Sequence, residues 1–134
     1  MNTQIKTSIY WLLLGVCFLT HTVFHIYGLF YGADIRLPDL TTNEVPLGVQ
    51  AFNTVIFTLT FLMALLSLHL SGRGFRWVSL MWSALFLLLN LAHLAGAVFM
   101  EAFDLSQVCL LCFVPVVNVL LILTLWKSLK QKAS

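Results

Sequence analysis

Charged residues are scarce in this 134-residue chain, in which Asp, Glu, Lys and Arg together make up 9% of the sequence. Soluble domains carry about 25% charged residues, and disordered segments carry more, so this scarcity excludes both classes. The formal net charge is only +2 and no basic run precedes the C-terminal tail, which argues against nucleic acid as a partner. Hydrophobic residues, in contrast, make up 60% of the chain.

Sequence motifs for nucleotide binding and for hydrolase chemistry are also missing. The chain contains no G-x-x-x-x-G-K-[ST], G-x-G-x-x-G, G-x-S-x-G or H-E-x-x-H pattern. Each of these motifs places backbone amides, a nucleophile or metal ligands at a fixed spacing that the chemistry requires. The sequence therefore gives no support for nucleotide binding or for hydrolase chemistry.

Four long apolar segments account for most of the chain. A membrane-spanning helix needs about 20 mainly apolar residues, and the segments that qualify are approximately 7–30, 47–70, 75–100 and 105–126. They are too long and too poor in alternation for barrel strands, and in lipid a helix satisfies its own backbone hydrogen bonds. Short connections favour antiparallel neighbours. We therefore predict an all-α membrane protein, a single domain over 1–134, folded as an up-down-up-down four-helix bundle in a lipid bilayer.

The few charges are divided unevenly between the two ends of the predicted bundle. With four spans, one end receives six of the seven basic residues, and the other receives all five acids, Arg36 and the outer loop 31–46. Basic residues favour the cytoplasmic side of a membrane. We therefore predict that both termini are cytoplasmic. A C-x-x-C pair at the other end is typical of an oxidising compartment, which favours a bacterial inner membrane.

Polar side chains within the predicted helices gather near one depth. Such side chains are costly in hydrocarbon and face the protein interior. Depth can be counted inward from the outer helix ends at about 1.5 Å per residue. The residues that share one level on this count are His25, Asn53, His93, Cys109 and Cys112. His21 and Asn90 form a second pair one turn deeper. The sequence therefore predicts an outward-facing polar pocket inside the bundle.

The histidines are the first reason to expect a cofactor in this pocket. His21 and His25 are four residues apart, so both face one side of a helix and His93 adds a third nitrogen. Thiolate prefers Cu(I) and zinc, so Cys109 or Cys112 would add sulfur. Alternatively, His25 and His93 are the two axial ligands of haem b. We predict a transition metal or haem b, for electron transfer or metal handling. The side chains expected to contact the cofactor are His25, His93, Asn53 and Asn90.

Cys109-Leu-Leu-Cys112 forms a C-x-x-C pair at the outer start of the fourth predicted helix, where the helix dipole favours a thiolate. This stretch resembles the quinone-reducing pair of the vitamin K epoxide reductase and DsbB-type membrane oxidoreductases, and Asn53 is similar to the asparagine that contacts quinone in the former. The resemblance implies thiol–disulfide catalysis by Cys109 and Cys112 with a quinone. Those families relay electrons through a second cysteine pair in an outer loop, which this chain lacks, so an external thiol partner would be needed.

A third interpretation needs no cofactor. Histidine, asparagine and threonine form hydrogen bonds between membrane helices, at about 0.6–2 kcal/mol each, and cysteine packs as a small apolar residue. The chain would then be a non-catalytic accessory subunit, and its polar layer would only specify packing. Small residues such as Gly15 and Gly96 permit close helix contacts, so a homo-oligomer or a larger membrane complex is compatible with all three interpretations.

Overall fold

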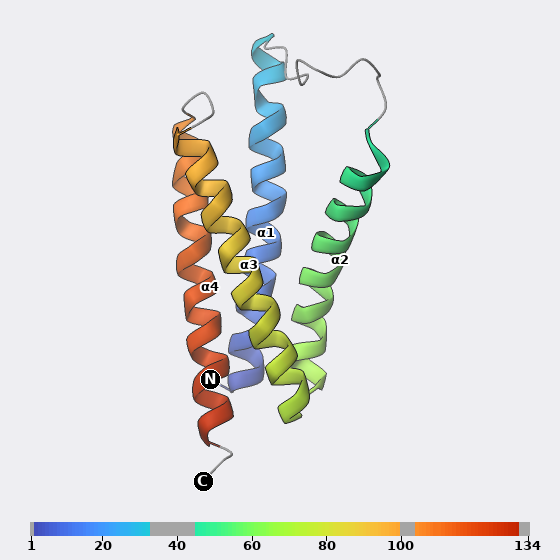
Figure 1. The fold of residues 1–134 in the computed structure, drawn as a ribbon, viewed down its shortest axis with the longest axis vertical. Helices are drawn as coiled ribbons and strands as arrows, with labels where there is room; N and C mark the ends of the chain where they lie inside the picture. The colour runs from blue at the N-terminus through green and yellow to red at the C-terminus, as the bar shows by residue number, and fades with distance from the viewer. Residues whose placement is uncertain (1, 33–44, 100–103, 132–134) are drawn as a thin grey trace.

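The structure, a computed structural model, describes residues 2–32, 45–99 and 104–131, and within these ranges it contains no strand. Its helices are α1 (Thr3–Tyr27), the short 3-10 helix η1 (Gly28–Tyr31), α2 (Leu47–His69), α3 (Arg73–Phe99) and α4 (Leu105–Gln131). All four α-helices are long and apolar enough to cross a membrane. The chain runs up, down, up and down through them (Figure 1), which confirms the predicted four-helix membrane bundle.

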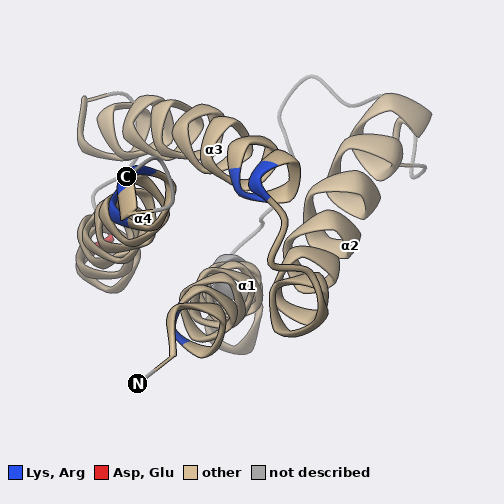
Figure 2. Ribbon diagram, turned by 90° about the horizontal axis from the view of Figure 1, so that it is seen from below, with Lys and Arg blue, Asp and Glu red and all other residues tan. Residues whose placement is uncertain are grey.

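The basic residues of the described ranges lie at the end of the bundle where α1 begins and α4 ends (Figures 1 and 2). We call this the basic end, and its members in the described ranges are Lys6, Arg73, Arg76, Lys127 and Lys130. The one acidic residue in those ranges, Asp104, stands immediately before α4 at the opposite end. Among the described residues, the basic side chains and the one acidic residue are thus at opposite ends of the bundle. The side of the membrane that the basic end faces stays a prediction.

The helix bounds differ from the predicted bounds mainly at the basic end. α1 begins at Thr3, α3 begins at Arg73 and α4 continues to Gln131, which is four, two and five residues beyond the predicted apolar segments. Long basic side chains explain this, because their stems pack along a helix while the charged groups reach out of the hydrocarbon layer. At the other end α1 stops at Tyr27 and gives way to η1, and most of the predicted loop 31–46 lies outside the described residues.

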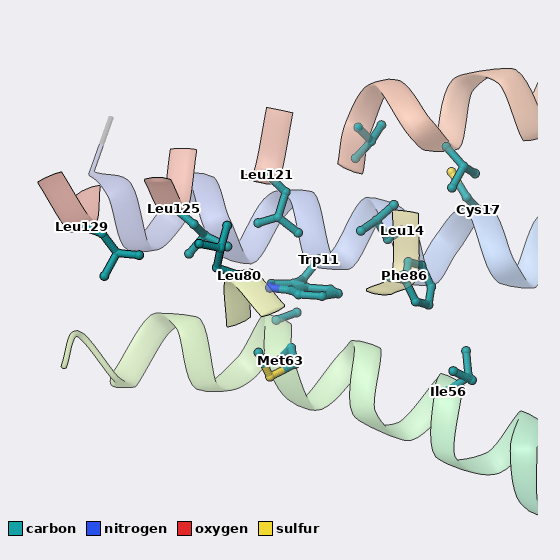
Figure 3. Packing of buried hydrophobic residues seen from close by; sticks show 13 residues of the cluster. Trp11, Leu14, Cys17, Ile56, Met63, Leu80, Phe86, Leu121, Leu125 and Leu129 are labelled. Atoms are coloured by element: carbon teal, nitrogen blue, oxygen red, sulfur yellow. The ribbon is translucent and has the colours of Figure 1, made fainter. Parts of the chain in front are cut away.

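Three pairs of helices make the main contacts of the bundle. Helix α1 packs against α2 on one side and α4 on the other, and α3 packs against α4. The side chains of Trp11, Leu14, Phe86 and Leu121 form the centre of the core (Figure 3). From its short connection with α3, α2 leans away from the other helices toward the opposite end of the bundle (Figures 1 and 2). The bundle is therefore closest packed in its basic half.

A buried amide joins α3 to α4 within this core. Asn118 is 0% exposed, and its side-chain amide lies 2.6 Å from Ser83 Oγ. In the orientation that satisfies both ends of the amide, Nδ2 donates to Ser83 Oγ and to the Ser83 carbonyl oxygen at 3.2 Å, and Oδ1 accepts from the Leu87 N–H at 3.0 Å. Asn118 therefore binds the backbone of α3 as well as a side chain.

Replacing Asn118 with leucine is expected to lower the free energy of unfolding by about 1–2 kcal/mol, because the Ser83 hydroxyl loses its interhelical partner. SDS titration of the detergent-solubilised protein would measure this loss. Thr124→Val on the same helix is the control, since the Thr124 hydroxyl donates to the Leu120 carbonyl of its own helix at 2.8 Å. Equal losses in the two variants would contradict an interhelical role for Asn118.

Candidate functional site

A cavity of about 610 Å³ lies between the four helices, in the half of the bundle away from the basic end. Its walls are mainly apolar. The polar side chains and the thiol along it are Cys17, His21, Thr22, Asn53, Asn90 and His93. The structure thus places four of the residues singled out from the sequence around one cavity, namely His21, Asn53, Asn90 and His93. Their role in binding stays a prediction.

His21 and His93 are in direct contact across this cavity. Their Nε2 atoms are 3.1 Å apart, and their rings meet edge to face with centroids 4.8 Å apart and planes at 86°. One ring must donate its N–H to the lone pair of the other, and the tautomers decide which ring is the donor. His21 is half-buried, whereas His93 is exposed at the cavity. The pair therefore offers two adjacent imidazoles that α1 and α3 hold together.

The pairing of His21 with His93 corrects the predicted depths, which placed His21 one turn below His93. Depth was counted from the helix ends on the assumption that all helices end at one level. α1 and η1 rise above the end of α3 (Figure 1), so His21 is closer to the level of His93 than the count implies. His25 lies in the last turns of α1, but its side chain lies outside the described residues, and its role stays a prediction.

The two asparagines contribute amides from opposite sides of the cavity. Asn90 is buried on α3, where its Nδ2 donates to the Phe86 carbonyl oxygen at 2.7 Å. That bond leaves Oδ1 as the group that Asn90 can offer to another donor. Asn53 is exposed on the outer half of α2, the helix that leans away. The cavity therefore has hydrogen-bonding groups on both walls.

The predicted meeting of the cysteines with the histidines does not occur in the described structure. Cys109 and Cys112 are free and exposed on α4, whereas that helix turns Leu110, Leu111 and Val114 toward the cavity. Depth along a helix does not determine which face of the helix points inward. Both thiols consequently lie away from the His21–His93 pair, and neither supplies a sulfur atom to the cavity.

Aromatic side chains form much of the cavity wall, and the sequence interpretation missed them. Phe18, Phe52, Phe57 and Phe86 line it. Phe18 contacts Phe57 and Phe86, with ring centroids 5.4 Å and 5.5 Å apart. A signal was present, since Phe52 precedes Asn53 and Phe86 stands one turn before Asn90. In a chain this rich in phenylalanine, such spacing does not separate a cavity wall from ordinary core packing.

No family model matches the chain, and neither a curated protein nor a solved structure matches it. Among the described side chains, no three His, Cys, Asp or Glu residues are grouped so as to hold a metal ion. The chemistry that this site can perform must therefore be inferred from the cavity and from the histidine pair beside it.

Proposed function

We propose that the protein binds a transition-metal ion through His21 and His93 at the cavity. The observation that carries this proposal is the 3.1 Å separation of the two Nε2 atoms. Two imidazole nitrogens that bind one tetrahedral ion at about 2.0–2.1 Å lie about 3.3–3.4 Å apart. The two nitrogens would therefore need to separate by roughly 0.3 Å, and the rings would also need to turn so that both Nε2 lone pairs point at the ion.

A metal ion requires neutral imidazoles whose lone pairs are available to it. In the hydrogen-bonded pair, one of the two rings carries a proton on Nε2. When a metal binds, that ring must carry its proton on Nδ1, so that both Nε2 lone pairs can bind the ion. No lysine or arginine lines the cavity among the described residues, because those residues lie at the basic end. A positive ion would therefore meet no like charge from the cavity wall.

Two nitrogens fill half of a tetrahedral coordination shell, so the ion would keep open positions. His25, four residues after His21 on α1, is the third ligand that the sequence predicts, and water would complete the shell. An ion held in an incomplete protein shell exchanges more readily than one in a closed structural site, which suits metal handling. A redox-active ion at this position would also support electron transfer.

Haem b and thiol chemistry receive less support from the same geometry. The axial ligands of a haem lie on opposite faces of the porphyrin, and two rings in hydrogen-bonding contact leave no space for a porphyrin between them. A haem held by His93 and His25 would depend on a side chain outside the described residues. For a thiol–quinone enzyme, Cys109 and Cys112 are exposed but lie away from the cavity in which a quinone would sit.

The proposal is tested by elemental analysis of the detergent-purified protein after loading with Zn²⁺ or copper and removal of excess metal. We expect one ion per chain in the wild type. Loss of a residue that only supports a metal ligand typically weakens metal binding by about 10–100-fold. His21→Ala and His93→Ala should each weaken binding by more than this, because each removes a ligand. His69→Ala is the matched control, because His69 is exposed at the other end of α2.

Two results would overturn metal binding at this pair. One is a wild-type protein that retains no metal after loading, and the other is equal retention by the His93→Ala and His69→Ala variants. A visible spectrum before and after dithionite, taken on the same samples, would reveal haem by its Soret band. If His21→Ala and His93→Ala change only the free energy of unfolding, the polar layer serves packing and the accessory-subunit interpretation holds.

A further inference from the structure

The size and depth of the cavity are those of a site for a small molecule from the membrane. Its volume of about 610 Å³ falls within the roughly 300–1,000 Å³ of typical ligand sites. Asn53 lies six residues after the start of α2, and His93 lies six residues before the end of α3. At about 1.5 Å per residue, both are roughly 9 Å inside their helix ends. A molecule that fills the cavity would therefore lie at hydrocarbon depth.

The cavity opens sideways in the half of the bundle where α2 leans away. The residues that both line it and are exposed lie on α1, α2 and α3, and they are Thr22, Ile26, Phe52, Asn53, Leu89 and His93. α2 leans away from α3 over this half of the bundle (Figure 1). Helices of this length and hydropathy are surrounded by lipid, so the opening faces the bilayer. A ligand would enter from the membrane without crossing the polar loops.

The closed side of the cavity is a braced aromatic wall. Phe86 is 2% exposed and meets the fully buried Trp11 edge to face, with centroids 6.3 Å apart. Phe18 packs between Phe86 and Phe57. Because these rings support one another, the side chains cannot readily collapse into the space. The aromatic wall is therefore an apolar surface that stays in place and against which the hydrocarbon part of a ligand can pack.

The two asparagines of the cavity suit an uncharged polar group of a ligand that both donates and accepts a hydrogen bond. Asn90 has Oδ1 to offer as an acceptor, since its Nδ2 is bonded to Phe86. The Asn53 amide, on the facing helix, has no hydrogen bond to another described residue and can donate. No Lys, Arg, Asp or Glu lines the cavity in the described ranges. A charged ligand group would therefore be buried without a counter-ion, which is energetically costly in an apolar environment.

From these observations we infer that the cavity binds a membrane-soluble alcohol, with its hydrocarbon body against the phenylalanine wall and its hydroxyl between Asn53 and Asn90. A hydroxyl supplies one donor and two acceptor lone pairs, which matches the two amides. This inference concerns the same cavity as the metal proposal but does not depend on it, because the amides and the aromatic wall are present whether or not an ion is bound.

The test uses a long-chain alcohol that carries a photoreactive diazirine in its chain, added to chelator-treated protein in phospholipid nanodiscs. After irradiation, mass spectrometry locates the labelled peptides. We expect label on the cavity-lining parts of α1, α2 and α3, and we expect excess unlabelled alcohol to compete. Leu89→Trp should reduce this labelling by about fivefold or more, since the added volume of an overpacked site costs about 1–3 kcal/mol. The control is Leu88→Trp, whose side chain is 65% exposed and outside the cavity.

A second pair of measurements tests the head group. Asn53→Leu should weaken alcohol labelling by about three- to tenfold, the loss of one hydrogen bond, and a photoreactive fatty acid of the same chain length should label the wild type poorly. Label spread evenly over lipid-facing residues, equal labelling of the Leu89→Trp and Leu88→Trp variants, or equal labelling by acid and alcohol would each overturn the inference. Because chelated protein is used, the result is independent of metal binding.

Discussion

Trp11→Ala is expected to lower the free energy of unfolding by about 3–5 kcal/mol, the usual cost of truncating a buried aromatic residue. Trp11 is 0% exposed and lies at the centre of the core. Its Nε1 donates to Ser79 Oγ at 3.0 Å, and its ring packs against Phe86. In a bilayer, helices are held together by such packing and hydrogen bonds rather than by exclusion of water. Alanine would therefore remove contacts that join α1 to α3 and leave an empty volume in the core.

The control for this prediction is the same substitution at Trp126, which is 43% exposed on α4 and contacts Trp77 and Lys130 at the basic end. Trp126→Ala should change the free energy of unfolding by less than about 1 kcal/mol, as surface substitutions generally do. SDS titration measures both variants. Ser79→Ala isolates the hydrogen bond, with an expected loss of about 1 kcal/mol. Similar losses for Trp11→Ala and Trp126→Ala would contradict the central role of Trp11.

The number and direction of the helices could be predicted because they depend on length and composition alone. The buried hydroxyls of the basic half could not, although Ser79 and Ser83 are both 0% exposed. A serine in a membrane helix can bond to its own backbone, so its presence carries little information about which face is buried. Only the structure shows that Ser79 meets Trp11 and that Ser83 meets Asn118.

The candidate site was partly predictable for a related reason. Histidine and asparagine are costly in lipid, so their inward position could be expected, and His21, Asn53, Asn90 and His93 do line one cavity. The cysteines could not be placed, because thiols are nearly apolar and carry no such penalty. The polar residue that marks the inward face of α4 is Asn118, which is 0% exposed, but it lies six residues after Cys112 and the sequence interpretation placed the cysteines by their depth.

Gly15 allows α1 and α2 to approach closely, in the part of the bundle from which α2 begins to lean away. A Cβ atom at Gly15 would lie 2.8 Å and 2.9 Å from two carbons of the Phe61 ring, nearer than such atoms pack. Leucine at this position would have to displace Phe61 or the whole of α2. Because α2 carries Phe52 and Asn53, such a displacement would also alter the cavity.

We expect Gly15→Leu to lower the free energy of unfolding by about 1–3 kcal/mol, the cost of overpacking a helix contact. Gly96→Leu on α3 is the matched control. A Cβ at Gly96 meets no atom of the described structure within 4 Å, and replacing a helical glycine removes a penalty of up to about 1 kcal/mol, so this variant should be neutral or more stable.

Combining Gly15→Leu with Phe61→Ala provides the decisive comparison in SDS titration. If the clash with the Phe61 ring causes the loss, the double variant should be more stable than the sum of the two single losses predicts. Strictly additive losses would show that α1 and α2 do not meet at Gly15 as the structure places them.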